Sequence, residues 1–396
     1  MLTSLYSGEE TSNKGAKIHL QRASLYFEAT PISRSRYLAT METTLSYDQL
    51  AGFTESVFQK IGCSEEDAAL ATRVLLMADL RGIDSHGIAR LSGYVRLWEA
   101  GRINVKPNIR IIHESPSTAV VDGDSGLGLV VAQKAMEIAI RKAEQVGTGW
   151  VSVQHSNHFG IAAAHAMMAL EKDMIGIALT NASPLVAPTY SSERLLGTNP
   201  ICVCIPAGKQ PPFVADMATT TAANGKLEIL QRKNQRAPEG WIQDKTGKIS
   251  TNPHELKAGG ALLPLGGDKE HGSHKGYALG AIVDILSAVL SGANYASWVP
   301  PFVSFLPVAD DLPGKGIGHF FGAMRIDAFR PANDFKKHMD QWVHRFRTAT
   351  PIEGQEKVLI PGDPEREMEV IRKEQGIPLL KAVLDDLEYL RERFGI

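Results

Sequence analysis

Between residues 47 and 100, apolar residues recur every three or four positions, the spacing of helices that bury one side. Three such helices are predicted, with Ser46, Ser64 and Ser85 at the positions of their N-caps. Gly101 follows the third pattern, as a glycine commonly follows the last turn of a helix. This part of the chain is therefore predicted to be helical.

From about residue 117 the pattern changes to short apolar runs that alternate with amphipathic segments, which is typical of layered α/β or α+β domains. Strands are predicted at 117–123, 149–156 and 174–183, two short apolar segments follow at 201–207 and 212–219, and 319–329 is a last strand candidate. Helices are predicted at 129–147, 159–173 and 277–292. After residue 333 the chain reads as helical and charged again, so a helical domain built from both chain ends is predicted.

These changes of pattern divide the chain into three parts. Residues 41–116 and 333–396 are predicted to form the helical domain, and residues 117–332 the cofactor-binding α/β domain. Residues 1–40 have no sustained periodicity and no apolar signal-peptide core, so we interpret them as an extension without a catalytic role, disordered or upstream of the natural start.

Composition excludes several classes of function. The chain has 396 residues, with 42 Lys and Arg against 44 Asp and Glu, so no basic excess favours nucleic acid as a partner. The most apolar run, 277–290, is interrupted by Asp284 and is too short to cross a membrane. Cys63, Cys202 and Cys204 fit neither a disulfide framework nor a zinc site, and we expect a cytoplasmic protein.

Familiar nucleotide and hydrolase motifs are missing. Gly123, Gly126 and Gly128 have the wrong spacing for the G-x-G-x-x-G turn of a Rossmann domain. The sequence also has no P-loop, no G-x-S-x-G elbow and no H-E-x-x-H motif. A standard Rossmann dehydrogenase is therefore disfavoured.

The first candidate for chemistry is the segment from Asp84 to Arg90. With Ser85 as the cap, His86 would lie in the first turn and Arg90 on the same helix face, four residues on. An imidazole beside a guanidinium suits a carbonyl next to a carboxylate, because the first can move a proton while the second binds the anion. Alternatively, both side chains are ordinary surface residues.

A second candidate lies at a strand-to-helix junction, from His155 to Gly160. Free amides at a helix start attract phosphates, and Gly160 allows close approach. His155 and His158 could instead bind metal, but no third ligand follows at a useful spacing, so no metal site is predicted. A capped helix start with buried imidazoles is the other reading.

Further polar residues end apolar strands or precede helices. Thr180, Asn181 and Ala182 end one strand, where α/β folds often contact ligands. Asp216, after another apolar run, could orient a histidine or cap a helix. Lys275, before the apolar helix, could meet a phosphate or a ribose hydroxyl, or simply be solvated.

Taken together, these segments resemble the malate/L-lactate dehydrogenase family of the non-Rossmann type. The similarity rests on DSHGIARL, HSNHFGIAAAHA, LTNASP, GTNPI, FVADMATT, SHKGYALGAIVDILSAVLSGA and IGHFF, in this order. It extends from about Met41 to the C-terminus. Relatives in this family include ureidoglycolate dehydrogenase, diketogulonate reductase, sulfolactate dehydrogenase and piperideine-carboxylate reductase.

The resemblance implies a homodimeric enzyme that uses NAD or NADP, with a largely antiparallel sheet in a non-Rossmann nucleotide-binding domain. It makes His86 the acid/base, with Ser85 and Asp216 as relay partners and Arg90 on the substrate carboxylate; His158 is the alternative acid/base. The cofactor contacts that it implies are His158, Phe159, Gly160, Ile161, Ala162, Thr180, Asn181, Ala182, Lys275, Gly314, Gly316 and Gly318.

The predicted function is therefore reversible hydride transfer between nicotinamide and a small 2-hydroxy or 2-oxo acid similar to malate or lactate. The alternatives are reduction of a cyclic imine or a sugar-derived ketoacid, and oxidation of ureidoglycolate. A hydrolase that uses Ser85, His86 and Asp216 is disfavoured, because neighbouring residues on a helix point about 100° apart.

Overall fold

The computed structural model describes residues 43–396, except 233, 305 and 307. The extension predicted at residues 1–40 lies outside the described residues. Residues Thr40–Ile396 form one compact unit. Within the described part, no helix combines the length and the apolar character that crossing a bilayer requires.

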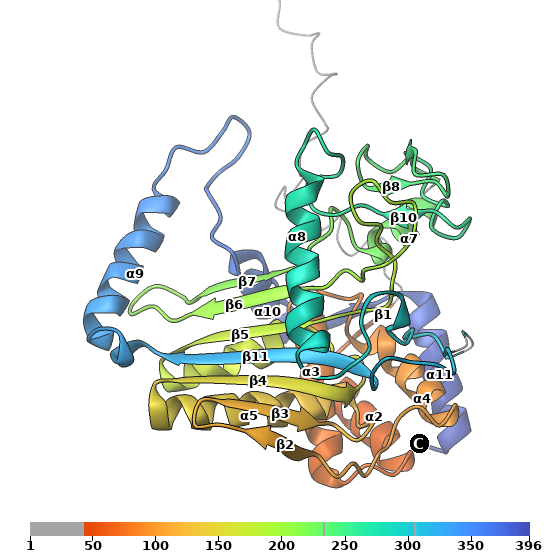
Figure 1. Ribbon diagram of the computed structural model, residues 1–396, viewed down its shortest axis with the longest axis horizontal. Helices are drawn as coiled ribbons and strands as arrows, with labels where there is room; N and C mark the ends of the chain where they lie inside the picture. Colours follow the sequence, from red (N-terminus) through yellow and green to blue (C-terminus); the bar gives the residue numbers. More distant parts are fainter. Residues whose placement is uncertain (1–42, 233, 305, 307) are drawn as a thin grey trace, which may run out of the picture. The chain divides into compact units, whose positions relative to one another are not determined.

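A seven-stranded sheet forms the centre of this unit (Figure 1). Its strands, in spatial order, are β2 (Arg110–Glu114), β3 (Thr118–Asp122), β4 (Thr148–Ser156), β11 (Ile317–Arg325), β5 (Met174–Thr180), β6 (Ile201–Ile205) and β7 (Phe213–Met217). Only β3 and β4 pair in parallel; the other neighbouring strands are antiparallel. The predicted strands are thus confirmed, the two short apolar segments form β6 and β7, and β2 lies where no strand was predicted. The sheet is largely antiparallel.

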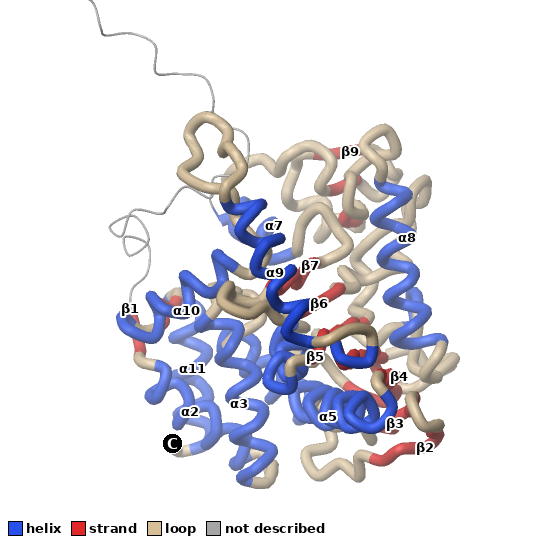
Figure 2. The backbone as a smooth tube through the Cα atoms, turned by 90° about the vertical axis from the view of Figure 1, so that its left-hand side faces the viewer, coloured by secondary structure: helices blue, strands red, loops and turns tan. Residues whose placement is uncertain are grey.

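Helices cover the two faces of the sheet differently. Figure 2 shows α3 (Glu65–Leu80) and α5 (Gly128–Val146) on one side of the strands and α8 (Ser273–Asp284) on the other. The main hydrophobic core lies between the sheet and the first of these layers. Gly149 allows α5 to pack closely, because a Cβ at this position would lie 1.9 Å from the carbonyl oxygen of Ala139.

Helices from both ends of the described chain pack together. α10 (Asp363–Gln375) contacts α3, and α11 (Lys381–Phe394) contacts α2 (Tyr47–Lys60) and α4 (Leu91–Glu99). The short strands β1 (Thr43–Leu45) and β12 (Ile377–Leu379) pair antiparallel beside them. By contrast, α9 (Ala332–Arg347) stands at the opposite end of the sheet from α4 and α11 (Figure 1). The domain boundaries after residues 116 and 332 stay a prediction.

A smaller cluster surrounds α7 (Asn224–Arg232) and a three-stranded sheet. The strands of this sheet are β10 (Ala261–Leu262), β8 (Ile242–Gln243) and β9 (Ile249–Ser250). The buried apolar side chains of this cluster also include Val186 and Leu196, which precede β6 in sequence. Gly225 at the start of α7 lies against Ser85, so this cluster borders the first candidate segment.

Local capping signals were accurate where the cap acts within its own helix. Ser46 accepts the N–H of Gln49, and Ser64 accepts the N–H of Asp67, as predicted. Gly147 ends α5 in the left-handed conformation, and Gly101 follows α4 with φ of 69°. These positions needed no knowledge of the rest of the fold.

Two helix predictions need correction. The helix predicted from Ser85 begins instead as a 3₁₀ turn at Ile88–Arg90 and continues as α4. The helix predicted at 159–173 is reduced to α6 (Ala163–Ala166) and a 3₁₀ segment, Met167–Lys172. Gly160 has φ of 80°, so its backbone cannot join a right-handed helix and delays the helix start.

Candidate active site

The turn between α3 and α4 carries Ser85, His86 and Arg90. The carboxylate of Asp79, at the end of α3, accepts the Ile88 N–H at 2.6 Å. Asp79 therefore binds the same backbone N–H that the Ser85 side chain would have bound if it were the N-cap. The Ser85 hydroxyl lies instead 2.8 Å from Nδ1 of His86.

The C-terminal helix α10 also holds this turn. Arg372, only 1% exposed, donates from Nη2 to the Asp84 carboxylate at 3.2 Å and from Nη1 to the backbone oxygen of Asp79. Gly87 lies so close that a Cβ there would be 2.1 Å from a carboxylate oxygen of Asp79. The position of His86 thus depends on contacts from two distant helices.

His86 and His158 form the centre of the site. Their rings stack, with centroids 5.7 Å apart and 23° between the planes. Tyr94 on α4 places its hydroxyl 2.7 Å from Nδ1 of His158, and the Phe302 ring lies 4.7 Å from the His158 ring. Both histidines are partly exposed, so a ligand can reach them.

Arg90 supplies the positive charge beside these rings. Its Nε donates to the backbone oxygen of Ser85 at 2.6 Å, and its guanidinium lies 5.9 Å from the centre of the Phe302 ring. Among the described residues, no hydrogen bond engages its two terminal nitrogens. A carboxylate could therefore bind to both of them in the paired geometry that guanidinium groups favour.

Burial and positive charge keep both imidazoles neutral. Burial, followed by the charge of Arg90, lowers the pKa of His86 to about 4. Burial lowers the pKa of His158 well below its usual value, and His86, Arg90 and His319 add to this effect. At neutral pH, the site thus offers two uncharged imidazoles next to one cation.

Asp216 has a different partner from the predicted one. Its carboxylate accepts the N–H of Ala163 at 2.8 Å, at the start of α6. Burial raises the pKa of Asp216 to about 6. Among the described residues no hydrogen bond joins Asp216 to His86. The sequence also allowed Asp216 to cap the helix that follows it, but the amide that it binds belongs to α6, an earlier helix.

His155 does not act with His158 as a ligand pair. Its Nδ1 lies 3.0 Å from the Asp122 carboxylate, and its Nε2 lies 2.7 Å from the Ser125 hydroxyl. This network stabilises the turn at Asp124 and Ser125, which both have positive φ. Within the part of the chain that the structure describes, no cluster of three or more His, Cys, Asp or Glu could hold a metal.

Several residues predicted to contact the cofactor lie around His319, a residue to which the sequence analysis assigned no role. His319 is fully buried; it contacts the Thr180 hydroxyl at 2.7 Å and stacks on Phe159 at 4.9 Å. Asn181 accepts the Gly318 N–H at 3.0 Å. The ends of β4, β5 and β11 therefore come together, as the predicted set requires.

The residues predicted to contact the cofactor differ in exposure and in their place in the fold. Phe159, Ile161 and Ala162 are buried, so their side chains are enclosed by protein. Lys275 is exposed in the first turn of α8, whereas Gly318 packs on Ser287, just beyond the other end of this helix. At 1.5 Å per residue, about 18 Å of helix separates them, so they could only contact opposite ends of an extended ligand.

The Gly314–Gly318 loop is closely packed. A Cβ at Gly314 would lie 2.4 Å from the oxygen of Ala293, and one at Gly318 would lie 2.1 Å from the oxygen of Ser287. Gly316 has φ of 60° and faces the oxygen of Ser156. These glycines are required by packing, whatever the loop binds.

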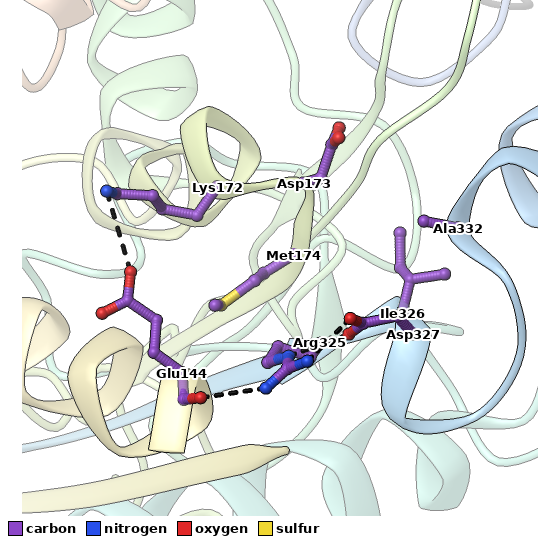
Figure 3. A pocket seen from close by; sticks show the side chains of 8 residues that line it. All are labelled: Glu144, Lys172, Asp173, Met174, Arg325, Ile326, Asp327 and Ala332. Atoms are coloured by element: carbon purple, nitrogen blue, oxygen red, sulfur yellow. Dashed lines mark hydrogen bonds and ion pairs between the residues drawn. The ribbon is translucent and has the colours of Figure 1, made fainter. Parts of the chain in front are cut away.

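A hollow of about 340 Å³ lies at the far end of β11 (Figure 3). Its lining residues are Glu144, Lys172, Asp173, Met174, Arg325, Ile326, Asp327 and Ala332. The charges pair with one another, as in Arg325 with Asp327 at 2.6 Å and Lys172 with Glu144 at 3.7 Å. Its lining residues include no histidine, and the six residues of β11 from His319 to Arg325, roughly 20 Å of strand, separate it from His319. Its chemistry offers nothing for a hydroxy acid.

Comparison with known proteins agrees with this geometry. The family model described as malate/L-lactate dehydrogenase matches residues 45–388. The chain belongs to this family. It is 44% identical to a malate dehydrogenase from Pyrococcus abyssi over 350 residues, which are 88% of this chain and 94% of that protein.

Two further comparisons extend the similarity. The chain is 39% identical to an L-sulfolactate dehydrogenase from Methanocaldococcus jannaschii, over 86% of this chain and 94% of that protein. A solved structure of malate dehydrogenase from Pyrococcus horikoshii matches with a TM-score of 0.81 at 40% identity, and the match covers 89% and 96% of the two chains. The protein is thus an oxidoreductase that acts on the CH–OH group of hydroxy acids with a nicotinamide cofactor.

Sequence reasoning missed three residues of the site. Tyr94 occupies an apolar helix position that reads as core, and Phe302 lies in a segment without periodicity. His319 lies inside a predicted strand. Only their contacts with His158 and Phe159 reveal a role, and these contacts join segments far apart in the sequence.

Proposed function

We propose that this enzyme interconverts a malate-like 2-hydroxy acid and its 2-oxo acid at the cluster of His86, His158 and Arg90. The observation that carries the proposal is the free guanidinium edge of Arg90 beside two neutral imidazoles. A 2-oxo acid presents a carboxylate next to a carbonyl, which matches this pair of groups. The names of the most similar relatives favour malate over lactate.

The chemistry of the surrounding residues fits a nicotinamide cofactor. When bound, it supplies or accepts the hydride. The junction from His158 to Ala162, the strand end from Thr180 to Ala182 and the Gly314–Gly318 loop would hold it on the antiparallel sheet, and Lys275 would contact a more distant part. This arrangement supports a nucleotide-binding domain that is not of the Rossmann type.

Side chains of the site orient the substrate, transfer the proton and exclude water. Arg90 orients the substrate by its carboxylate, which holds the carbonyl in a reactive geometry. His86 gives a proton to the carbonyl oxygen in reduction and takes it back in oxidation. Tyr94 and Phe302 pack around His158 and exclude water from one side of the site.

The charge of Arg90 couples substrate binding to the proton on His86. Arg90 lowers the pKa of His86 in the free protein. A carboxylate paired with Arg90 cancels much of that charge, so the pKa of His86 rises in the complex. Binding of a 2-oxo acid therefore favours the protonated form of His86 that reduction requires, while burial, the larger cause of the lowered pKa, remains.

The alternative substrates predicted from the sequence would be recognised in the same way. Cyclic imine carboxylates, sugar-derived ketoacids and ureidoglycolate also carry a carboxylate next to the reacting carbon, so Arg90 would bind them in the same way. A hydrolase that uses Ser85, His86 and Asp216 has no support, because Asp216 binds the Ala163 amide instead.

We also propose a homodimer, and we place its interface on α8 and on the π-helical segment Ile285–Val289 that continues it. Ala278, Ile282, Ile285 and Val289 form an exposed apolar seam along these two segments. Ile282, Ile285 and Val289 are 50 to 53% exposed. A second copy of the same seam would cover these side chains.

The test of the reaction is nicotinamide absorbance with NADH and NADPH separately. Oxaloacetate, pyruvate, 2-oxoglutarate, glyoxylate and a cyclic imine carboxylate are compared, and ureidoglycolate is tested in the oxidative direction. We expect the fastest oxidation with oxaloacetate, and the pair of cofactors decides between NAD and NADP. Turnover of another acid alone would replace the malate assignment, and no turnover of any would refute the proposal.

A further inference from the structure

Tyr94 is a buried tyrosine with a single strong polar partner. It is 0% exposed, and its ring packs edge-on against Phe58 at 6.4 Å and Phe302 at 5.2 Å. Its hydroxyl lies 2.7 Å from Nδ1 of His158 and 3.5 Å from the His158 backbone oxygen. A buried hydroxyl without a hydrogen bond is costly, so the contact with His158 explains a tyrosine at this core position.

A contact with a backbone N–H shows which nitrogen of His158 carries the proton. The backbone N–H of Gly160 points to the same Nδ1 at 3.4 Å. Because an N–H group can only donate, Nδ1 must be an acceptor, and the ring proton resides on Nε2. The Tyr94 hydroxyl therefore also donates to Nδ1.

The surroundings oppose a second proton on this ring. His158 lies against the ring of His86 and near the charge of Arg90, and burial lowers its pKa further. Among the described residues, no hydrogen bond engages Nε2 of His158. Its N–H is therefore available to a ligand.

His86 differs in its partner. The Ser85 hydroxyl beside its Nδ1 can either donate or accept, so it permits both tautomers and the protonated form. No backbone N–H contacts the His86 ring among the described residues. His158 is thus held in one tautomer, whereas His86 is free to exchange its proton.

We propose that Tyr94 is a positioning residue that fixes His158 as the Nε2–H tautomer, so that His158 is a constant hydrogen-bond donor to the substrate oxygen. In reduction, that oxygen takes its proton from His86, which regains one from solvent, while His158 keeps its own proton. This inference rests on the proposed function for the identity of the ligand. The tautomer of His158 can be measured without any ligand.

The test is Tyr94→Phe, which removes one hydroxyl and keeps the ring. Nitrogen NMR of labelled histidine, with the His158 signal assigned through His158→Gln, reports the tautomer. We expect a constant Nε2–H pattern in the unmodified enzyme from about pH 5 to 8. In Tyr94→Phe we expect mixed tautomers, because only the longer contact with the Gly160 N–H, at 3.4 Å, still favours Nδ1 as the acceptor. We also expect kcat to fall about tenfold, with a shifted pH profile and a KM for the acid within about twofold.

Phe58→Leu is the matched control. It loosens the packing of the Tyr94 ring without touching the hydroxyl, so it should lower stability and leave the tautomer and the pH profile unchanged. A wild-type His158 with its proton on Nδ1 would overturn the proposal, whatever the variants do. So would a Tyr94→Phe enzyme with an unchanged tautomer and unchanged kcat. Absence of turnover with every acid would refute the proposed function, while the NMR result would still decide the role of Tyr94.

Discussion

At the scale of single residues, the site combines one fixed cation with two imidazoles that are neutral when no substrate is bound. Arg90 is anchored through Nε to the backbone of Ser85, which leaves its terminal nitrogens for a carboxylate. Its charge also lowers the pKa of His86. Substrate recognition and proton supply therefore depend on the same side chain.

Replacing Arg90 by methionine should impair both substrate recognition and proton supply. We expect kcat/KM for the 2-oxo acid to fall about a hundredfold, which corresponds to about 2.7 kcal/mol, because the carboxylate loses a paired ionic contact. Without the neighbouring charge, the pKa of His86 should rise, so the pH profile of the free enzyme moves upward.

Arg96→Met on α4 is the control, since Arg96 is exposed and its hydrogen bond goes to Ser92. Steady-state kinetics against pH distinguishes the two variants. Equal kcat/KM in Arg90→Met and Arg96→Met would contradict the role of Arg90 as the carboxylate ligand.

At the scale of elements, the decisive segment is the turn from Arg81 to Gly87. Its conformation depends on contacts with Asp79 at the end of α3 and with Arg372 in α10, and not on capping by Ser85. This is why the N-cap predicted at Ser85 was wrong, whereas those at Ser46 and Ser64 were confirmed. A local pattern identifies a cap only where no distant side chain competes for the same N–H.

Gly87→Ala should disturb this turn. The added Cβ would lie 2.1 Å from the Asp79 carboxylate, so either the turn or Asp79 must move. We expect a loss of about 1 to 3 kcal/mol of stability, typical of overpacking, together with a clear fall in kcat as His86 shifts.

Gly52→Ala provides the comparison, because a Cβ at this exposed position on α2 meets nothing within 4 Å. It should leave kcat unchanged and raise stability by up to about 1 kcal/mol through helix propensity. Urea unfolding and kcat are measured on both variants. A Gly87→Ala enzyme with normal activity would show that the turn tolerates displacement.

The exposed seam on α8 gives a prediction about assembly. Ile282→Lys combined with Ile285→Lys places two charges in the proposed interface, so we expect sedimentation to show a monomer. Val370→Lys is the control, because Val370 is an apolar residue on α10, outside the seam, and is 60% exposed. A dimer that survives the double substitution would place the interface elsewhere.

At the scale of the whole molecule, several neutral histidines are buried in the folded chain. His165 and His319 are 0% exposed, and burial lowers their pKa values to about 4 and about 3. His165 accepts from Gln133 and donates to the Phe159 oxygen, so it is satisfied only as the neutral ring. Unfolding lets these rings bind protons at their ordinary pKa.

Stability should therefore fall as the pH drops below about 6.5. In that range the unfolded state binds protons that the native state excludes, so the free energy of unfolding decreases until the pH approaches the lowered native values. Urea unfolding at several pH values between about 7 and 5 should show an uptake of more than one proton per molecule.

His319→Gln is the informative variant for this dependence. It removes one of the groups, so the slope of stability against pH should decrease by about one proton even if the variant is less stable overall. Buried Asp79 and Asp216, whose pKa values are raised to about 8 and about 6, act in the opposite direction, because they bind protons in the native state. A slope that is the same in the wild type and His319→Gln would therefore be the result that contradicts the neutral burial of His319.

Sequence alone was sufficient for most strands of the sheet and for the helices capped by Ser46 and Ser64, because each depends on neighbours a few residues away, but it did not predict β2. It could not show Tyr94 and Phe302 at His158, or the contact of Asp216 with α6. These contacts form only when α4, the loop before β11 and the end of β7 meet. Apolar periodicity records that Tyr94 is buried but not what its hydroxyl touches.

The most direct test of the central claim is the rate of NADH or NADPH oxidation with oxaloacetate in the wild type, His86→Ala and His113→Ala. His113 is an exposed histidine on β2, so its variant controls for the loss of any imidazole. The account predicts equal rates for wild type and His113→Ala, and a rate lower by about 10² to 10⁴ for His86→Ala. A His86→Ala enzyme that turns over at the full rate would contradict the assignment of the acid/base.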